Sequence, residues 1–305
     1  KSHAVSYSML SYQCAYLFHY HPVEWIAAFL DKEPESRKEK AITIAKGMGF
    51  EIVPVDINRS GFDWEIIGAN KIIQPLTSIK GLGEKAIEQI VNHRPFDTVE
   101  QFLFHPEIVY SKLNKKALDV LARSEALNDL MDERFCGLRH FWKCIAKERP
   151  RKLEAFLKNI EKYREGWEDE TGEHISPMYS DEERIENLIN LTGLYPFGLV
   201  ISEQSLSRLR EIKVPALSEY DRDLKAHWFI VREKIAKKTK NGKEYWILTC
   251  IDNAGGTNTI KCWGIIPEKD DKLIKLNSAY MAVLDYHEQW GFSTRSIKKN
   301  FRMLK

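Results

Sequence analysis

The chain has 305 residues, which is enough for two or three domains. Hydrophobic residues make up 43% and charged residues 30%, as in ordinary globular proteins, and no apolar run reaches the roughly 18 residues of a membrane-spanning helix. The net charge is only +2, so the total charge gives no argument for a polyanionic partner. Five cysteines without a C-x-x-C pair are typical of a reducing compartment, and we expect a cytoplasmic protein with no membrane segment.

The N-terminal third reads as short helices. A helical pattern covers residues 4–30 and is interrupted by Pro22, a residue that suits a helix start. A second amphipathic pattern covers residues 36–47, and an extended segment is expected at residues 51–55. Because the chain opens inside a helical pattern, we expect it to be a piece of a longer protein.

The sharpest motif is the glycine hairpin, residues 79–90, with the sequence IKGLGEKAIEQI. It matches a helix-hairpin-helix pattern. Two glycines permit a tight turn and let backbone N–H groups approach a phosphate, while a helix that opens at the second glycine directs its donors to the same place. Such contacts ignore base identity and weaken with salt. The predicted DNA-binding residues here are Lys80, Gly81, Leu82, Gly83 and Lys85.

Two other interpretations of the hairpin stay open. Gly81, Gly83 and Ala86 also fit the dinucleotide fingerprint G-x-G-x-x-A, which requires a preceding strand and a later acidic residue on a second strand. Residues 75–80 make a poor strand, which disfavours this interpretation. The hairpin could also be a plain helical pair that binds nothing.

The middle of the chain predicts further helices over 98–130 and 134–167 and a helix over 182–190 that Ser180 caps. Cys136, His140 and Cys144 share a helical spacing that suggests zinc. Eight residues of helix rise about 12 Å, however, whereas a zinc–sulfur bond is about 2.3 Å. We therefore predict no metal site in the chain.

After about residue 226 the pattern changes to short β-prone runs separated by glycine turns, which predicts a small barrel similar to an OB-fold. The expected strands are Trp228–Val231, Tyr245–Ile251, Thr259–Trp263 and Tyr280–Leu284. Residues 232–243 carry six cations and one acid, a locally basic surface that favours nucleic acid. The candidate nucleic-acid contacts are Lys234, Lys237, Lys238, Lys240, Lys243, Trp246 and Lys261, with Trp263 as a second candidate for base stacking.

The predicted fold class is therefore α+β and multidomain, with an N-terminal all-α region that contains the helix-hairpin-helix, followed by an OB-fold-like β-barrel. The expected segments are a distal-fingers-like helical segment (1–60), a helix-hairpin-helix region (61–135), a helical connecting region (136–225) and the OB-fold-like domain (226–305).

The order of several landmarks resembles the bacterial replicative DNA polymerase III alpha subunit, a C-family polymerase. The landmarks are Lys1–Leu17, His21–Leu30, Val53–Ser60, Ile79–Gly83, Leu113–Ala117 and the OB-like region. The resemblance implies template-directed DNA synthesis in the full-length protein, with Mg²⁺ held by palm aspartates. Those aspartates precede the fingers in the family and have no counterpart here, so no catalytic residue and no cofactor is assigned to this chain. The expected partner is DNA: primer–template duplex in the first place, with single-stranded template as a second candidate.

The resemblance also implies that Lys1, Ser2 and His3 lie near the phosphates of the incoming nucleotide, although an ordinary helix cap explains them equally well. A sliding clamp is a possible partner, but Gln101–Phe104 and Gln204–Arg208 both depart from the family's clamp-binding peptide. Ser124-Glu125-Ala126 replaces the family's Gly-Ala turn, which puts anion binding by the second hairpin in doubt. Two alternatives to a polymerase piece stay open: a stand-alone DNA-binding or repair module, and a structural protein that binds no DNA.

Overall fold

The computed structural model describes residues 2–131, 138–142, 148, 151–164, 178–253 and 256–304. Cys136 and Cys144 of the rejected zinc pattern lie outside the described residues. The chain divides into two compact units, one of residues 1–42 and 49–195 and one of residues 43–48 and 196–305, and each unit is described by itself. No helix among the described residues is both long enough and apolar enough to cross a membrane.

The N-terminal helices follow the predicted pattern. Helix α1 spans Ser2–Tyr20, α2 spans Pro22–Lys32, and α3 spans Lys38–Gly47 after a 3-10 turn, η1, at Glu35–Arg37. Pro22 lies in the first turn of α2, where its missing N–H costs nothing. Most large apolar side chains of helix α1 are exposed, and Tyr12 has an exposed fraction of 72%.

A small three-stranded sheet follows these helices. Strands β1 (Glu51–Val53), β2 (Glu65–Gly68) and β3 (Lys71–Ile73) have the order β1-β3-β2, with β1 parallel and β2 antiparallel to β3. The extended segment predicted at 51–55 is thus strand β1. The helical character of the N-terminal region is confirmed, and this sheet is an addition that the sequence pattern did not reveal.

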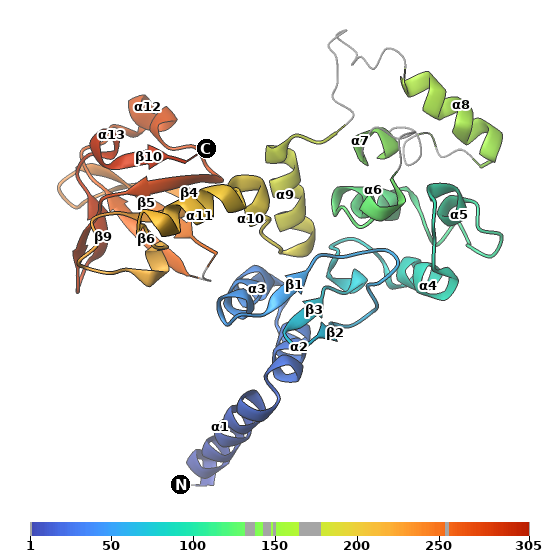
Figure 1. Ribbon diagram of the computed structural model, residues 1–305, viewed down its shortest axis with the longest axis horizontal. Helices are drawn as coiled ribbons and strands as arrows, with labels where there is room; N and C mark the ends of the chain where they lie inside the picture. The colour runs from blue at the N-terminus through green and yellow to red at the C-terminus, as the bar shows by residue number, and fades with distance from the viewer. Residues whose placement is uncertain are drawn as a thin grey trace. The chain divides into compact units, whose positions relative to one another are not determined.

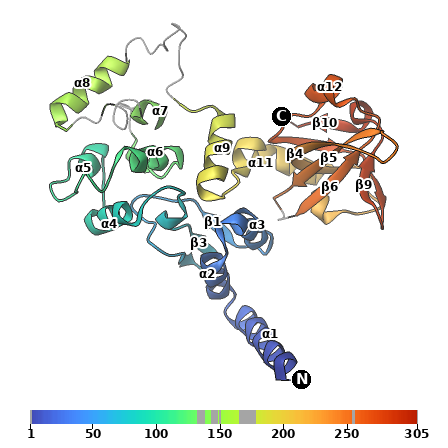
Figure 2. The same ribbon diagram turned by 180° about the vertical axis from the view of Figure 1, so that it is seen from behind.

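The region around the glycine hairpin is built from short helices around one core. The 3-10 turn η2 (Leu76–Ser78) precedes the helices α4 (Glu84–His93), α5 (Val99–Leu103) and α6 (Lys115–Arg123), and α4 to α6 lie side by side in Figures 1 and 2. The 3-10 turn η3 (Asn128–Leu130) and the helices α7 (Leu138–Phe141), α8 (Leu153–Arg164) and α9 (Asp181–Thr192) complete the unit. Ile79, Leu82, Ile87, Ile90 and Leu118 belong to the shared core.

Two local expectations in this unit have clear outcomes. Ser180 caps α9 in a capping box with Glu183, as predicted. The helix expected before the hairpin is a single 3-10 turn instead. It ends at once because Ile79 is extended, with φ −76° and ψ 105°, and the Ser78 hydroxyl donates back to the carbonyl of Pro75 (2.7 Å).

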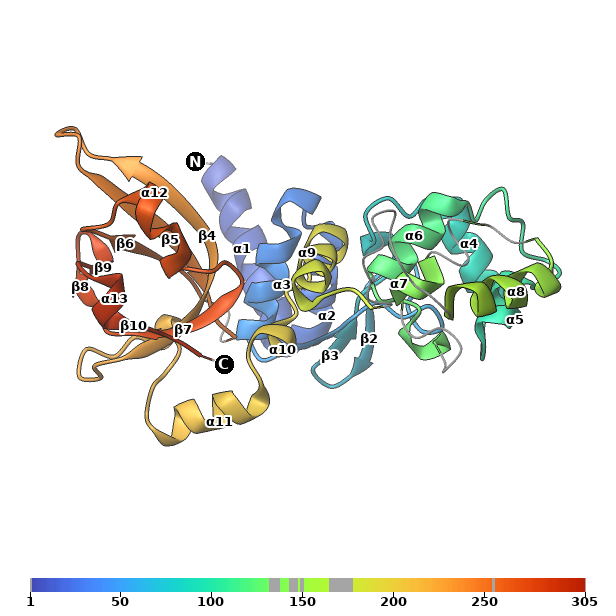
Figure 3. The same cartoon turned by 90° about the horizontal axis from the view of Figure 1, so that it is seen from above.

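The C-terminal unit contains one curled sheet. Helices α10 (Phe197–Val200) and α11 (Glu203–Glu211) and the 3-10 turn η5 (Leu217–Glu219) precede it. The strands are β4 (His227–Lys238), β5 (Glu244–Ile251), β6 (Thr257–Cys262), β7 (Ser278–Ala282), β8 (Asp285–His287), β9 (Gly291–Thr294) and β10 (Phe301–Met303), interrupted by α12 (Pro267–Asp270), η6 (Asp271–Leu273) and α13 (Ile297–Asn300). Figure 3 shows α12 and α13 beside the curved strands.

The sheet has the order β10-β7-β4-β5-β6-β9-β8, and every pairing is antiparallel except that of β6 with β9. It curls into a half-barrel of the OB-like kind, which confirms the predicted fold class. The four predicted strands correspond to β4 to β7, and β8 to β10 are additional. Phe229, Trp246, Leu248 and Ile260 are among its core residues.

Candidate nucleic-acid interface

The glycine hairpin makes a tight turn immediately before α4. Gly81 has φ +92°, a left-handed conformation that strains any residue with a side chain, so this position requires glycine. Gly83 is the residue that caps α4, with φ −78° and ψ 149°, and a side chain placed there would meet nothing within 4 Å. The backbone at Gly83 is thus open to an approaching group.

The start of α4 offers backbone donors. Among the residues that the structure describes, no side chain caps this helix, and the amide of Ala86 already donates to the carbonyl of Gly83 (2.9 Å). The first N–H groups of a helix have no carbonyl partner within it, so the amides of Gly83, Glu84 and Lys85 have none there. Together with the positive end of the helix dipole, they form a site suited to an anion.

Three lysines surround this opening. Lys80, Lys85 and Lys116 are all exposed, and among the described residues none of them has a recorded ion pair. Lys116 comes from α6: its Cε lies 3.2 Å, and its Nζ 3.7 Å, from the point that a Cβ on Gly81 would occupy. The glycine motif could not identify Lys116, because Lys116 lies 35 positions after Gly81 in the chain.

Leu82 has a different place from its neighbours. Its side chain is 8% exposed and packs in the core, and its amide donates to the carbonyl of Ile79 (3.0 Å). Leu82 therefore fixes the shape of the hairpin and offers no free donor. The 3-10 turn and the extended Ile79 also take the place of the strand that a dinucleotide fingerprint requires, so that interpretation fails.

The hairpin is anchored to a distant part of its unit. The amide of Lys80 donates to the carbonyl of Leu191 (2.8 Å), and the buried side chain of Gln74 donates to the carbonyl of Thr192 (3.0 Å). Both acceptors lie at the end of α9. Helix α9 thus fixes the turn that exposes the glycines.

The start of α6, the helix of the second hairpin, is capped by a side chain, whereas no described side chain caps the start of α4. The Asn114 side chain caps α6 by accepting from the amide of Ala117 (3.0 Å), so this helix start already has an acceptor of its own. At the other end of α6, Glu125 stands in a left-handed conformation with φ 63°, where glycine is favoured. Its carboxylate accepts from Arg184 (2.6 and 3.1 Å), and this hydrogen bonding raises the pKa of Arg184.

The lysine-rich β4–β5 turn is exposed as the sequence suggested. Lys237, Lys238, Lys240 and Lys243 are exposed, and Gly242 closes the turn with φ +76°. Lys238 forms an ion pair with Glu244 across the strands (2.8 Å). Three of these four cations have no recorded ion pair among the described residues, which leaves a basic strand end.

Lys234 and Trp246 do not form part of this surface. Trp246 is 2% exposed and lies in the core of the barrel, so the expectation that it stacks on bases is wrong: no face of the ring is open to a base. The Lys234 side chain lies 4.9 Å from the centre of the Trp246 ring and is bound to Asp271 (2.6 Å). Both residues stabilise the barrel.

An aromatic groove lies on the β6–β9 side of the barrel, with a volume of about 700 Å³. It contains Lys261 and Trp263 from the predicted set, the cation Arg295, the acid Asp285, and Tyr286 and Trp290, which the sequence did not single out. Trp290 is 61% exposed, and the Lys261 ammonium lies 5.4 Å from the centre of its ring. Trp263 stacks on Tyr245 at 4.4 Å between ring centres. The groove thus combines two cations and one acid with the exposed aromatic rings of Tyr286 and Trp290.

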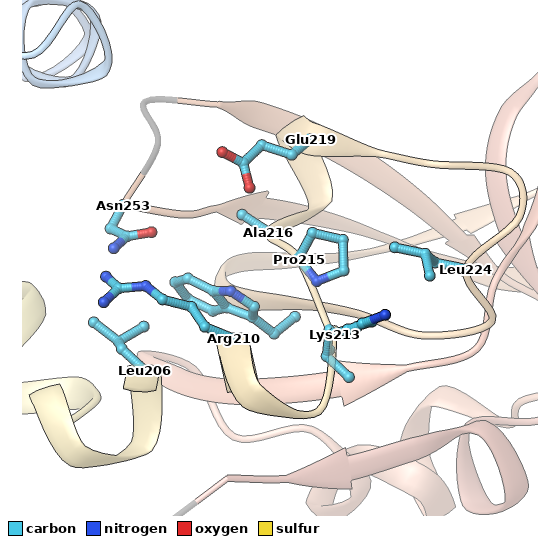
Figure 4. A pocket seen from close by; sticks show the side chains of 10 residues that line it. Leu206, Arg210, Lys213, Pro215, Ala216, Glu219, Leu224 and Asn253 are labelled. Atoms are coloured by element: carbon cyan, nitrogen blue, oxygen red, sulfur yellow. The ribbon is translucent and has the colours of Figure 1, made fainter. Parts of the chain in front are cut away.

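A second pocket of about 410 Å³ lies between α11 and the segment that leads into β4. Figure 4 shows Arg210 and Lys213 on one side of it and Glu219 on the other. Two cations and one acid line this pocket, and it contains none of the predicted contact residues.

The remaining predicted positions give little support for a site. Lys1 lies outside the described residues, and His3 is exposed in α1 with its ring edge against Tyr7 (4.5 Å). In the clamp-like segment 101–104, Phe102 and Leu103 are buried in the core and are not available to a partner.

Comparison with known proteins identifies the same region. The helix-hairpin-helix motif family matches residues 49–136. The chain is 29% identical to the DNA polymerase III subunit alpha of Thermus aquaticus over 277 residues, which is 85% of this chain and 22% of that protein. It is 27% identical to the subunit of Aquifex aeolicus over 282 residues, which is 88% of this chain and 22% of that protein. It is 34% identical to the subunit of Deinococcus radiodurans over 134 residues, which is 42% of this chain and 10% of that protein.

The chain spans about a fifth of the length of the first two relatives. The region of likeness contains the glycine hairpin and extends through the chain. We conclude that this chain is homologous to DNA polymerase III alpha subunits over about 85% of its length, and that it contains a helix-hairpin-helix motif.

Proposed function

We propose that the chain is a DNA-binding portion of a replicative DNA polymerase, and that the glycine hairpin holds a phosphate of duplex DNA. The observation that supports this most directly is the uncapped start of α4, with an open Gly83 and three lysines around it, inside a recognised helix-hairpin-helix motif. Backbone amides and lysines recognise phosphate oxygens and carry no base information. Binding is therefore independent of sequence and decreases with salt.

Within the hairpin the roles differ. The amides of Gly83, Glu84 and Lys85 donate to the phosphate oxygens, and Gly81 allows the turn that exposes them. Lys80, Lys85 and Lys116 supply positive charge around the same point. Lys116 brings charge from the second helical pair to the first, so both pairs of the motif contribute to one phosphate site.

The half-barrel supplies a second contact surface. The aromatic groove offers Trp290 and Trp263 for stacking and Lys261 for the backbone of a single strand, which is how OB-like surfaces bind unpaired nucleic acid. The lysines of the β4–β5 turn (Lys237, Lys238, Lys240 and Lys243) contact the backbone. A base that stacks on Trp290 is worth about 1–3 kcal/mol.

DNA synthesis belongs in this proposal to the full-length polymerase. Palm aspartates with Mg²⁺ carry out nucleotidyl transfer in that protein, and we assign no residue of this chain to that step. Residues 1–60 correspond to the distal fingers, 61–135 to the helix-hairpin-helix region, 136–225 to a connecting region and 226–305 to the OB-like domain. Lys1, Ser2 and His3 remain proposed contacts of the nucleotide phosphates, and a sliding clamp remains a possible partner.

The test measures the affinity of the full chain for a fluorescent duplex by anisotropy over a range of salt concentrations. For each phosphate contact the slope of log K against log salt is about −0.9, so the triple variant K80Q/K85Q/K116Q should have a slope that is less steep by about 2–3. The exposed lysines Lys40, Lys152 and Lys158 provide a control triple with the same loss of charge.

Equal losses in the two triple variants would mean that the hairpin has no special role. A primer-extension assay with Mg²⁺ and nucleotides completes the test. Synthesis by this chain alone would contradict the assignment of catalysis to residues outside it.

A further inference from the structure

A cluster of two histidines and one glutamate lies at the far end of α4 from the glycine hairpin. His93 is the last residue of α4, and His105 and Glu107 lie in the segment between α5 and α6. One nitrogen of each ring and one carboxylate oxygen all lie within 4.8 Å of one another. The Nε2 of His93 and a carboxylate oxygen of Glu107 are 3.6 Å apart.

The His93 ring is held in the orientation that a metal ligand needs. Its Nδ1 lies 2.7 Å from the carbonyl oxygen of Gln89, so Nδ1 carries the proton and donates it to that oxygen. This leaves the lone pair on Nε2, the nitrogen that faces Glu107. Metal-binding histidines are usually oriented by such a bond from the second ring nitrogen.

Gln89 also positions the segment that carries the other two residues. Its side chain is 6% exposed, and its carbonyl oxygen Oε1 accepts from the amide of Val109 (2.8 Å). The ring of His105 packs against Phe96 with 6.3 Å between ring centres and against His93 with 5.0 Å. One buried glutamine therefore sets both sides of the cluster, through its backbone and its side chain.

We propose that His93, His105 and Glu107 bind a divalent transition-metal ion of the zinc class. Two imidazole nitrogens and one carboxylate oxygen are a ligand set for zinc, with the fourth position open to water. Zinc–ligand bonds of about 2.0–2.1 Å place tetrahedral ligand atoms about 3.3 Å apart, close to the 3.6 Å between His93 and Glu107. The side chain of Glu107 is 75% exposed, so the ion can reach the carboxylate from solvent.

Binding requires one small rearrangement. The amide of Glu107 donates to Nδ1 of His105 at 3.3 Å, and either ring nitrogen can bind a metal only if this long hydrogen bond is lost. The ring then turns so that its ligand nitrogen comes closer to the other two ligand atoms, all three of which lie within 4.8 Å of one another. The negative end of the α4 dipole also favours a cation beside His93.

The ion would connect the end of α4 to the α5–α6 segment. Gly83 and His93 are ten positions apart, which is about 15 Å of helix, so the ion makes no contact with a phosphate at the hairpin. Its effect is on stability, because an ion that binds only the folded chain raises the unfolding temperature. This inference does not depend on DNA binding.

The test is calorimetric titration of the untagged full chain with zinc chloride, together with thermal unfolding with and without zinc. We expect one ion per chain and a higher unfolding temperature. H105N and E107Q should each weaken zinc binding at least about tenfold, because loss of even an outer partner costs about 10–100-fold. Matched controls are E88Q on the same helix and H287N on the half-barrel, both exposed residues outside the cluster.

The outcomes separate the metal site from a plain ion pair between His93 and Glu107. No binding by the wild type, or equal binding by the wild type and both cluster variants, would overturn the proposal. E107Q keeps the chain folded in our expectation because Glu107 is mostly exposed, and circular dichroism checks this point. If K80Q/K85Q/K116Q loses DNA binding but still takes one zinc ion, the two sites are independent.

Discussion

Gly83 offers a substitution that should change DNA binding and stability in opposite directions. Its extended backbone suits any residue, and a new side chain there meets nothing within 4 Å. Aspartate is a favourable helix cap, better than glycine by a few tenths of a kcal/mol. A negative charge at a helix start adds about 0.3–1 kcal/mol. Gly83→Asp should therefore stabilise the chain by about 0.5–1 kcal/mol.

The same side chain would take the donors of the proposed phosphate. Loss of one charge-assisted hydrogen bond costs about 1.5–3 kcal/mol, which corresponds to an affinity for duplex DNA about 10–100-fold lower. The salt dependence should lose about one phosphate contact, a change in slope of about 0.9. Anisotropy titrations measure both quantities, and thermal unfolding measures the gain in stability.

Two variants make the comparison sharp. Gly83→Asn caps the helix without a charge, so it separates occupation of the donors from electrostatic repulsion. Gly198→Asp adds the same charge at another glycine with open space around it, in the half-barrel unit. A Gly83→Asp chain that unfolds at a higher temperature but binds duplex within twofold of the wild type would refute the phosphate site.

Four further predictions concern single side chains. Asp252→Ala should lower the free energy of unfolding in urea by about 2–4 kcal/mol, because this buried carboxylate accepts from the amide and hydroxyl of Ser218 (2.9 and 2.8 Å). Glu125→Gly should be more stable than Glu125→Ala by about 1 kcal/mol in the same assay, because both lose the ion pair but only glycine relieves the positive φ. Burial lowers the pKa of His227, so the unfolded chain takes up a proton at a higher pH than the folded chain. The free energy of unfolding should therefore fall as the pH drops below about 6.5, the pKa of histidine in an unfolded chain. His227→Gln should flatten that decline between pH 7 and 5. Trp290→Ala should weaken binding of a single-stranded oligonucleotide by about 1–3 kcal/mol, and an unchanged affinity would remove the aromatic groove from the interface.

Local signals in the sequence were sufficient for much of the fold. Pro22 at a helix start, the Ser180 cap and the glycine turns each act within a few residues, and the structure agrees with them. The strands β8 to β10 were missed because they are three or four residues long, too short for an alternating pattern to stand out. Strands β2 and β3 of the small sheet near the N-terminus were missed for the same reason.

The candidate site shows the limit of local reasoning more clearly. The hairpin glycines could be found because their spacing carries the chemistry. Lys116 could not, because only the packing of α6 brings it to Gly81. Trp246 was misplaced because strand residues alternate between two faces, and the sequence does not say which face is buried. His93 and His105 are brought together by the fold alone, since twelve positions separate them.

The two hydrogen bonds from Gln74 and Lys80 to the end of α9 have a practical consequence for anyone who wishes to isolate the motif. The recognised family region stops at residue 136, whereas the carbonyls that hold the turn belong to residues 191 and 192. A peptide cut at the family boundary would lose these two hydrogen bonds and expose their donors to water, at a net cost of about 0.5–1.5 kcal/mol each. The smallest autonomous DNA-binding piece should therefore extend beyond Thr192.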